Sequence, residues 1–415
     1  MLVCDAFRVA HKRLRRVSVQ LQLQRALYLT LTPLWVLGVV VLRFVNRFKP
    51  IQLGGLNAGR LGHLVMDVEM FLSEREICCP GYRMNALDLR YVWTAGLPIS
   101  NSLILDLWRS QFKFGPRWLL QPVDRWNRRI PGGESTQTPW RKGPGKLNQH
   151  DDLYGALRNT APHLPITRRH FDLAKSVLSD VRPSFDMTKP YVCIHVRDRT
   201  YFDHHQPNNR DDATRDADIS DYESAIKVLT AMSINVVRMG ALSNFPLTFK
   251  DDLVWDYACD GSRSELLDLI LPARCLFFIS TLSGPDKIAQ LFRRPVLFTN
   301  FAPLKSIPLW MTDSLIAPKR LRYLDGQYLT WREIFASNFY TLKQEQLSKH
   351  GVEVVANSPE EIRCAVEEMI FRISHSHSDL SRVDDDWQSL LEIIPAYLKA
   401  GGVRARIAEN FIKDR

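Results

Sequence analysis

The stretch Tyr-Val-Cys-Ile-His-Val-Arg-Asp, residues 191–198, is the part of the sequence that decides the fold. It begins as an apolar strand and ends abruptly in the polar residues His195, Arg197 and Asp198. Because side chains alternate along a strand, His195 and Arg197 share one face and Val196 takes the other. In a parallel sheet, these polar residues would lie at the carboxyl ends of the strands, where such sheets bind ligands.

The rest of the second half repeats this alternation of apolar strands with amphipathic helices. We predict strands at residues 191–196, 234–239, 253–255, 275–279, 295–299 and 352–355, and helices at residues 220–232, 264–271, 285–292 and 359–373. The last helix has a clear start, with Ser358 as N-cap and Pro359 at the first helical position. Strands separated by helices predict a doubly wound parallel α/β sheet.

The position of Arg197 suits it to bind a diphosphate. The planar fork of guanidinium donors matches phosphate oxygens bidentately, and the predicted strand ends just before it. Arg238, at the end of the next predicted strand, is a second candidate for the same role. The alternative is a purely structural role, in which Arg197 forms a buried salt bridge with an aspartate and His195 has its hydrogen bonds satisfied by neighbouring residues. The sequence leaves both interpretations open.

A second motif follows the strand at residues 275–279, where a turn of small residues precedes a helix. Exposed amides at the start of that helix would form an anion site at the positive end of the helix dipole. The residues that would contribute are Ser280, Thr281, Ser283 and Gly284. N-capping of the helix by Ser283 is the alternative, and the choice of small residues favours phosphate binding.

Residues 209–222 are rich in aspartate and arginine ahead of a predicted helix. Most of the acids are interpreted as solvating a loop or capping the helix. Arg215 and Tyr222 are the candidates for contact with a donor substrate.

In the first half, a glycine loop at residues 54–62 precedes a predicted helix at residues 63–74. Gly59 and Gly62 allow the backbone to approach a ligand or a facing domain closely, and Arg60 lies between them. His63 at the helix start is a candidate general base toward an acceptor hydroxyl, or else a capping or cleft-structuring residue. A strand at residues 87–93, helices at 102–111 and 168–178, and a surface loop at 131–146 complete this half.

The N-terminus combines basic residues with an apolar run at residues 26–42. A bilayer crossing needs about 20 apolar residues, and Pro33 and Gly38 interrupt the run, so we expect a tilted, re-entrant or interfacial membrane anchor. A buried core helix is the alternative. The flanking basic residues are Arg8, Lys12, Arg13, Arg15, Arg16, Arg25, Arg43, Arg47 and Lys49. This pattern predicts a peripheral, monotopic or single-pass protein at the cytoplasmic face of the inner membrane.

Composition narrows the class of protein. The chain has 415 residues, 45% of them hydrophobic and 24% charged, which is enough for two globular domains. Its net charge of +10 favours an anionic partner. Scattered acids argue against a nucleic-acid-binding stripe. The seven cysteines are odd in number and scattered, and the adjacent pair Cys78-Cys79 is poorly suited to an ordinary disulfide, so we expect a reducing compartment and no disulfide framework. The acidic pair Asp251-Asp252 and the acidic run 384–386 do not follow an apolar strand as a metal-diphosphate site would require, so we interpret them as solvated loop acids. No P-loop, zinc spacing or nucleophile elbow occurs, and we expect no cofactor and no metal.

These motifs resemble a family of bacterial surface-polysaccharide glycosyltransferases. The matching stretches are Cys-Ile-His-Val-Arg-Asp with Tyr201, Arg-Asp-Ala-Asp-Ile with Tyr222, Val-Val-Arg-Met-Gly at 236–240, Asp-Tyr-Ala at 256–258, Ile-Ser-Thr-Leu-Ser-Gly at 279–284, and Pro-Val-Leu-Phe-Thr-Asn-Phe-Ala-Pro at 295–303; Arg-Leu-Gly-His-Leu at 60–64 also fits. The match covers roughly residues 52–370. It implies a GT-B fold, in which two Rossmann-like domains flank a cleft.

Two more distant resemblances concern the donor. His195-Val-Arg197 is similar to the His-x-Arg-Arg-x-Asp motif of fucosyltransferases that use GDP-fucose, but Asp198 stands where that motif has its second arginine. The Ser-Gly-Pro turn at 283–285 is similar to that of heptosyltransferases, which use ADP-heptose. Both relatives imply a nucleotide-diphosphate sugar as donor.

We expect an anchor at residues 1–50, an acceptor domain at 51–185, a donor domain at 186–375 and a helical extension at 376–415, with the domain junction between Pro183 and Pro190. The resemblance implies that the donor nucleotide binds in the C-terminal domain. We expect transfer of a hexosyl or deoxyhexosyl group to a glycan or lipid-linked acceptor, without metal and with inversion. A catalytically silent carbohydrate- or nucleotide-binding protein that organises a membrane biosynthesis complex is the alternative.

Overall fold

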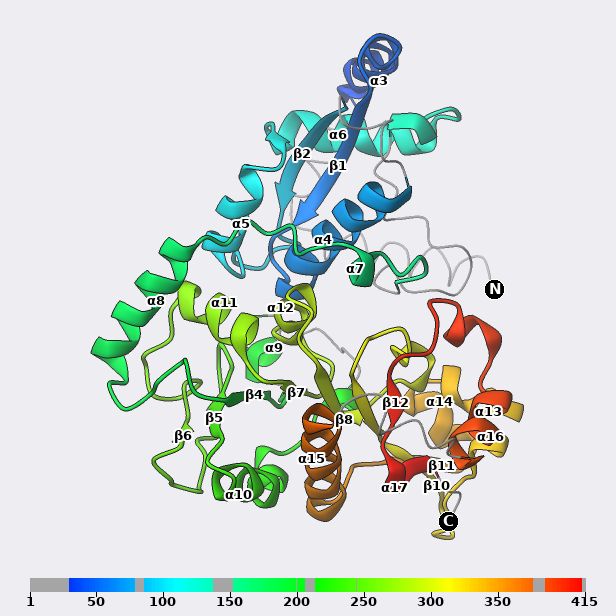
Figure 1. Cartoon of the computed structure of the whole chain (residues 1–415). Helices are drawn as coiled ribbons and strands as arrows, with labels where there is room; N and C mark the ends of the chain where they lie inside the picture. Colours follow the sequence, from blue (N-terminus) through cyan, green and yellow to red (C-terminus); the bar gives the residue numbers. More distant parts are fainter. Residues whose placement is uncertain are drawn as a thin grey trace, which may run out of the picture. The chain divides into compact units, whose positions relative to one another are not determined.

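A computed structural model describes residues 30–78, 86–136, 152–198, 200–205, 213–243, 245–375 and 385–412 (Figure 1). The chain divides into two compact units. The small unit falls within Met1–Gly55, Gly81–Val92 and Phe112–Thr138, and the large unit within Leu56–Pro80, Trp93–Gln111 and Pro139–Arg415. The domain boundaries expected from the sequence stay a prediction, and so does the GT-B architecture. The predictions for residues 1–29, 137–146 and 209–212 lie outside the described residues.

The large unit is built on a parallel sheet in the order β12-β9-β8-β7-β4-β5-β6. Its strands are β4 (Tyr191–His195), β5 (Asn235–Arg238), β6 (Val254–Trp255), β7 (Phe278–Ser280), β8 (Val296–Phe301), β9 (Leu315–Pro318) and β12 (Arg406–Ile407). The predicted parallel α/β sheet is therefore confirmed. The prediction omitted β9 and β12, and β12 is too short to give a periodic signal.

The order of the strands reverses between β4 and β7. From β4 the chain adds β5 and β6 on one side, whereas β7, β8 and β9 extend the other side. The two strands at the reversal pair directly, with His195 opposite Ser280. Open parallel sheets bind ligands beyond the carboxyl ends of the strands at such a reversal.

The helices within the described residues are α3 (Thr32–Asn46), α4 (Leu61–Cys78), α5 (Ser102–Arg109), α6 (Arg117–Arg129), α7 (Ala156–Asn159), α8 (Arg168–Val181), α9 (Thr200–His205), α10 (Glu223–Ala231), α11 (Glu265–Arg274), α12 (Asp286–Leu291), α13 (Trp331–Ala336), α14 (Gln344–Lys349), α15 (Pro359–Ser374), α16 (Asp385–Ile393) and α17 (Glu409–Ile412). Short 3-10 helices are η1 (Glu134–Thr136), η3 (Ala213–Arg215), η4 (Ile219–Tyr222), η5 (Leu304–Ser306), η6 (Phe339–Thr341) and η7 (Ala396–Lys399).

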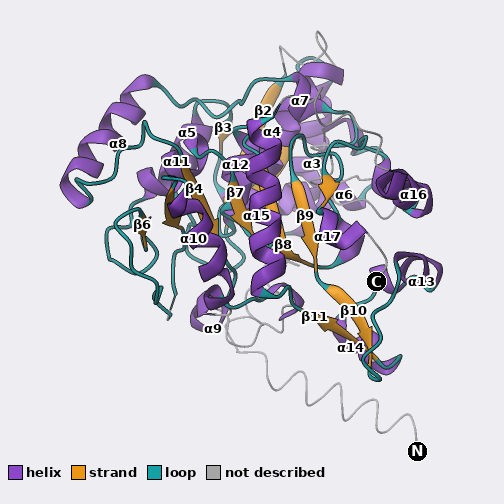
Figure 2. Ribbon diagram, turned by 60° about the horizontal axis from the view of Figure 1, so that its bottom comes forward, coloured by secondary structure: helices purple, strands orange, loops and turns teal. Residues whose placement is uncertain are grey.

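Helices cover the sheet of the large unit, as Figure 2 shows for α10 and α15. Helix α15 packs against β8 and β9, and α12 packs against β7 and β8. The predicted start of α15 is confirmed, because Ser358 accepts from the amide of Glu361 and the Glu361 side chain accepts from Ser358 in return.

The strand predicted at residues 352–355 is correct in its bounds but lies in a different sheet. It is β11 (Val352–Val355), which pairs antiparallel with β10 (Arg320–Tyr323) in a separate two-stranded sheet. A four-residue strand does not reveal its partner, because pairing depends on segments distant in the sequence.

The first half forms a three-stranded sheet in the order β1-β2-β3. Its strands are β1 (Ile51–Asn57), β2 (Leu87–Trp93) and β3 (Lys113–Phe114), and β2 matches the prediction at both ends. Gly54 and Gly55 lie inside β1 rather than in a loop. A Cβ at Gly55 would lie 2.7 Å from the ring of Tyr91, so this glycine admits an aromatic ring to the face of the strand.

Helix α3 belongs to the small unit, where one of its faces is part of the core. Trp35, Val39 and Leu42 are buried, and α3 packs against α6. Pro33 lies in the first turn, where proline is well tolerated, so it starts the helix instead of interrupting it. A Cβ at Gly38 would lie 2.8 Å from Val123, so this glycine brings the two helices together. The core-helix alternative is thus correct for one face of α3.

The sequence predicts an N-terminal apolar helix whose length is only marginal for crossing a membrane. Among the residues that the structure describes, no helix has the length and apolar content that a membrane span requires.

Candidate active site

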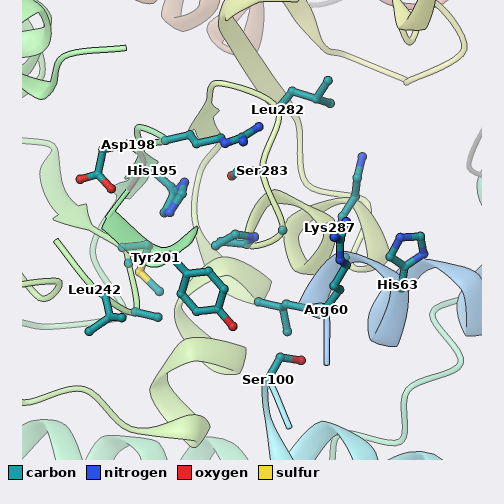
Figure 3. Close-up of a pocket in the computed structure, with 18 of the residues that line it drawn as sticks. Arg60, His63, Ser100, His195, Asp198, Tyr201, Leu242, Leu282, Ser283 and Lys287 are labelled. Atoms are coloured by element: carbon teal, nitrogen blue, oxygen red, sulfur yellow. The ribbon is translucent and has the colours of Figure 1, made fainter. Parts of the chain in front are cut away.

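A cavity of about 1000 Å³ lies in the large unit at the carboxyl ends of β4, β5 and β7 (Figure 3). Residues that follow these three strands line it, together with the start of α4 and the segment 97–100. The cavity therefore coincides with the reversal of strand order, where the topology predicts a ligand.

Most of the residues expected from the sequence line this cavity. They are Gly59, Arg60, Gly62, His63, His195, Arg197, Arg215, Arg238, Ser283 and Gly284. Tyr222, Ser280 and Thr281 do not line it; all three are fully buried. Folding thus brings the glycine loop of the first half and the strand ends of the second half to one cavity.

Arg197 is held firmly at the cavity wall. Its Nε lies 3.2 Å from Oδ1 of Asp216, and its backbone N–H donates to Oγ1 of Thr281 at 2.9 Å. Its side chain is buried apart from the surface that it presents to the cavity. The two interpretations of Arg197 are therefore compatible, because the ion pair with an aspartate orients a guanidinium that also lines the cavity.

His195 is neutral in the folded protein near pH 7. Burial lowers its pKa to about 4, although the carboxylates of Asp286 and Asp198 act in the opposite direction. Its Nδ1 is buried and has no hydrogen-bond partner among the described residues. A buried ring nitrogen without a partner costs free energy unless a bound molecule satisfies it, so His195 is a candidate ligand contact.

Arg238 shapes the cavity through a buried polar network. Its guanidinium donates to the carbonyl of Phe245 at 2.6 Å and to Oγ of Ser243 at 2.7 Å, and it pairs with Asp256 at 3.3 Å. Ser243 in turn donates to Asp198 at 3.3 Å. Arg238 therefore ties together the segments that follow β4 and β5, and its charge is largely compensated by Asp256.

The turn after β7 is organised by Asp286, which the sequence analysis did not single out. Its Oδ2 accepts from the amide of Ser283 at 2.7 Å and from Oγ of Ser280 at 2.6 Å. Ser283 does not cap α12; Pro285 is at the N-cap position. The Ser283 amide, expected to face a phosphate, thus donates to a carboxylate of its own turn. Ser283 and Gly284 still present their other atoms to the cavity.

Tyr222 is a core residue of the large unit. Its hydroxyl bonds Oγ1 of Thr299 at 2.7 Å and accepts from the amide of Asn300 at 3.1 Å. Burial raises its pKa to about 12. The sequence suggested Tyr222 as a donor contact because it follows the charged stretch ahead of a helix, but its packing against Thr299 and Asn300 of β8 depends on residues distant in the sequence.

His63 forms a pair with Asp67 one turn later on α4. The Nδ1 atom of His63 lies 3.2 Å from Oδ2 of Asp67. A carboxylate at Nδ1 favours the tautomer whose lone pair is on Nε2, as a general base requires. Asp67 was missed, although its i, i+4 spacing from His63 on a predicted helix was a usable signal.

A buried ion pair fixes α4 against α12. Oε1 of Glu69 on α4 lies 2.7 Å from Nη2 of Arg293, which directly follows α12, and Glu69 is fully buried. Arg293 has a left-handed backbone with φ of 60°, a strained conformation for a residue with a Cβ. The pair holds the start of α4, with His63, in a defined position relative to the turn after β7.

The cavity carries an excess of positive charge. Its cationic side chains are Arg60, Arg197, Arg215, Arg238, Arg263 and Lys287, whereas its acids are Asp198 and Glu265. Figure 3 shows Arg60, His63 and Lys287 on one side and His195, Asp198 and Tyr201 on the other. Sequence reasoning missed Arg263 and Lys287 as site residues. The sequence could have revealed Lys287 as a site residue, since it follows Gly284 by three residues at the start of a predicted helix.

The described residues include no cluster of histidine, cysteine and carboxylate side chains suited to hold a metal ion.

Comparison with known proteins gives distant structural similarities. No family model matches the chain, and no curated protein matches it. A glycosyl transferase family 9 structure from Veillonella parvula is similar at 10% identity with a TM-score of 0.43, over 78% of this chain and 97% of that one. A structure of TibC, an iron-containing dodecameric glycosyltransferase from enterotoxigenic E. coli, is similar at 13% identity with a TM-score of 0.28, over 60% of this chain and 57% of that one.

A second TibC structure, a heptosyltransferase in complex with ADP-D-beta-D-heptose, is similar at 13% identity with a TM-score of 0.26, over 60% of this chain and 58% of that one. At these identities and TM-scores, none of the three similarities decides the family or the reaction.

Proposed function

We propose that this protein is a glycosyltransferase that transfers a sugar from a nucleotide-diphosphate donor to a glycan or lipid-linked acceptor. One observation carries the proposal: a large cationic cavity lies at the reversal of strand order in a parallel sheet, and His63, which is paired with Asp67, lines it on the side away from His195. Such a site suits an anionic, extended donor together with a hydroxyl that must lose a proton.

The donor diphosphate would lie against the ends of β4 and β7. Arg197 would bind its oxygens through guanidinium N–H groups, with Asp216 holding the side chain in place. Arg215 and the turn at Ser283 and Gly284 line the same region. Charge-assisted bonds of this kind strengthen as negative charge develops on the leaving diphosphate, so they favour the transition state over the ground state.

The reaction is a substitution at the anomeric carbon. The acceptor oxygen forms a bond to that carbon while the bond from carbon to the diphosphate oxygen breaks, and the nucleoside diphosphate leaves with the bonding electron pair. The acceptor proton passes to Nε2 of His63, whose Nδ1 is held by Asp67. Attack from the face opposite the leaving group inverts the anomeric configuration. We propose that the transferred sugar is a hexosyl or deoxyhexosyl group.

The biological setting that we propose is bacterial surface-polysaccharide synthesis at the cytoplasmic face of the inner membrane. The resemblance of residues 52–370 to such enzymes supports it. A lipid-linked acceptor would require the enzyme to work next to a membrane.

The experiment that tests the function has two stages. First, a thermal-shift screen against nucleoside diphosphates should reveal one that raises the melting temperature, because a ligand at a hundred times its dissociation constant stabilises by about 2.7 kcal/mol. Second, the matching nucleotide sugar should release its nucleoside diphosphate when an acceptor is supplied. Binding without turnover for any acceptor would favour a catalytically silent binding protein. Absence of any nucleotide binding would overturn the proposal.

A further inference from the structure

Helix α3 has a second apolar face that the small unit does not bury. Its exposed residues follow helical spacing along one side: Leu34, Leu37, Val41 and Phe44. Phe48, two residues after the helix ends, is 76% exposed. The buried residues Trp35, Val39 and Leu42 lie on the face toward α6. Soluble helices are usually apolar on one side only, so a helix that is apolar on both needs a second apolar environment.

The neighbouring helix α6 adds exposed apolar surface to the same unit. Its first turn carries Trp118, which is 70% exposed, and Leu119. Tryptophan is enriched where a protein meets the boundary between lipid headgroups and acyl chains, because its ring is both apolar and polar.

The exposed charges of helices α3 and α6 themselves are of one sign. No acidic residue occurs at positions 30–50, and the single acid of α6, Asp124, is buried against Tyr91 and Arg128. The exposed basic side chains on and beside the two helices are Arg47, Lys49, Arg117, Arg125 and Arg129. A positive rim around an apolar face is complementary to anionic lipid headgroups.

We propose that the exposed face of α3, with Trp118 of α6, inserts into one leaflet of an anionic bilayer, with α3 lying in the plane of the membrane. The helix has 15 residues, a length of about 22 Å at 1.5 Å per residue, which is short of the hydrocarbon thickness of about 30 Å. Its flanking cations then lie at the headgroup level of the same leaflet. A second copy of the chain is a poorer occupant, because two positive rims would repel each other.

This inference deepens the proposed function. It rests on the proposed function in one respect, the lipid-linked acceptor. The contact would place the protein beside such an acceptor. The surface itself is independent of the cavity, which is lined by residues of the large unit alone.

The test is flotation of the full chain with vesicles of phosphatidylcholine, with and without phosphatidylglycerol. We expect flotation with the anionic vesicles and weaker flotation in high salt, which screens headgroup attraction. The double substitution Leu37→Asp with Phe44→Asp should lower the bound fraction at least about tenfold, because two apolar side chains no longer enter the lipid. The melting temperature should stay unchanged, since both positions are exposed.

The matched control is Leu324→Asp with Phe371→Asp, which replaces a leucine and a phenylalanine that are 79% and 52% exposed in the large unit. This control should float like the unchanged protein. Equal flotation of the α3 variant would overturn the proposal by assigning membrane binding to another segment, such as residues 1–29. No flotation of the full chain would overturn it as well.

A dimer in sedimentation analysis that dissociates in the α3 variant, without vesicle binding, would show that a second copy covers the face and would overturn the proposal. Nucleotide binding, measured by thermal shift in the same variants, keeps the two proposals separate. If neither the unchanged protein nor any variant binds a nucleotide, the result counts against the proposed function and leaves the membrane contact intact.

Discussion

Gly62 at the start of α4 and Gly284 in the turn after β7 face each other in the large unit. A Cβ at Gly284 would lie 3.4 Å from the backbone nitrogen of Gly62, and a Cβ at Gly62 would lie 3.7 Å from Cα of Gly284. Two residues without side chains thus allow the glycine loop to approach the proposed donor turn. A methyl group at either position would make ordinary contact, so only side chains larger than alanine would push apart the two walls of the cavity.

The glycines of the loop should respond differently to alanine. A Cβ at Gly59 would lie 2.1 Å from the carbonyl oxygen of Thr94, a backbone atom that cannot move aside, so Gly59→Ala should destabilise the protein by about 2 kcal/mol or more. Gly62 lies in a helix, and its nearest obstacle is the flexible side chain of Lys287 at 3.4 Å. Gly62→Ala should therefore be neutral or stabilising by up to about 1 kcal/mol. Denaturant unfolding of both variants checks this; equal losses would contradict it.

Arg197→Ala should weaken nucleotide binding about 10- to 100-fold, the effect of losing a hydrogen bond to a charged group. Arg197→Lys should recover only part of the affinity, because lysine keeps the charge and lacks the bidentate fork. The matched control is Asp216→Asn, which removes the partner of Arg197 and leaves the arginine in place. This variant should lose stability and retain more affinity than Arg197→Ala. Unchanged affinity in folded Arg197→Ala protein would remove Arg197 from the donor site.

His63→Ala should lower turnover by about 10²- to 10⁴-fold, the usual contribution of a general base, with donor affinity unchanged. Asp67→Asn should have a smaller effect, because it only weakens the orientation of the ring, and it should shift the pH profile of turnover. His163→Ala is the control, since His163 also contacts carboxylates, Glu69 and Glu76, outside the cavity. That variant should affect stability more than turnover. Full turnover in His63→Ala protein would assign proton removal to another group.

His195 should make the protein less stable at mildly acidic pH. Its pKa is about 4 in the folded protein and about 6.5 in an unfolded chain, so the unfolded chain binds the extra proton between these values. Stability from this group is complete above about pH 6.5 and is lost as pH falls, by about 2 kcal/mol at pH 5.

Chemical unfolding at neutral and acidic pH, for the unchanged protein and His195→Asn, measures this contribution as a difference. Burial and the neighbouring Asp152 raise the pKa of Glu74 to about 7, so Glu74 lowers the stability of the fold as pH rises. This contribution is the same in both proteins and cancels in the comparison. An identical pH dependence in the two proteins would show that His195 is not desolvated.

Sugar transfer should persist in excess chelator, because we propose that Arg197, Arg215 and the turn at Ser283 and Gly284 stabilise the leaving diphosphate. Turnover with and without chelator, on protein first freed of divalent ions, provides the measurement. Activity that disappears and returns with magnesium or manganese would reject the metal-free mechanism.

The sequence by itself determined the elements whose signals are local. The apolar strand at Tyr191–His195 and the capped start of α15 at Ser358 follow from propensity, alternation and capping chemistry within a few residues. Most of the site residues that it predicted also line the cavity, because polar side chains at the carboxyl ends of parallel strands must gather at one edge of the sheet.

Only the tertiary structure decided what those side chains contact. The Ser283 amide is bound by Asp286, Tyr222 is buried against Thr299, and α3 is packed on one face and exposed on the other. These outcomes depend on which chain segments meet in space, and residues distant in the sequence set the partners and the burial of each group. Local patterns predict where a strand or helix forms, whereas long-range packing determines whether a polar residue at its end stays available to a ligand.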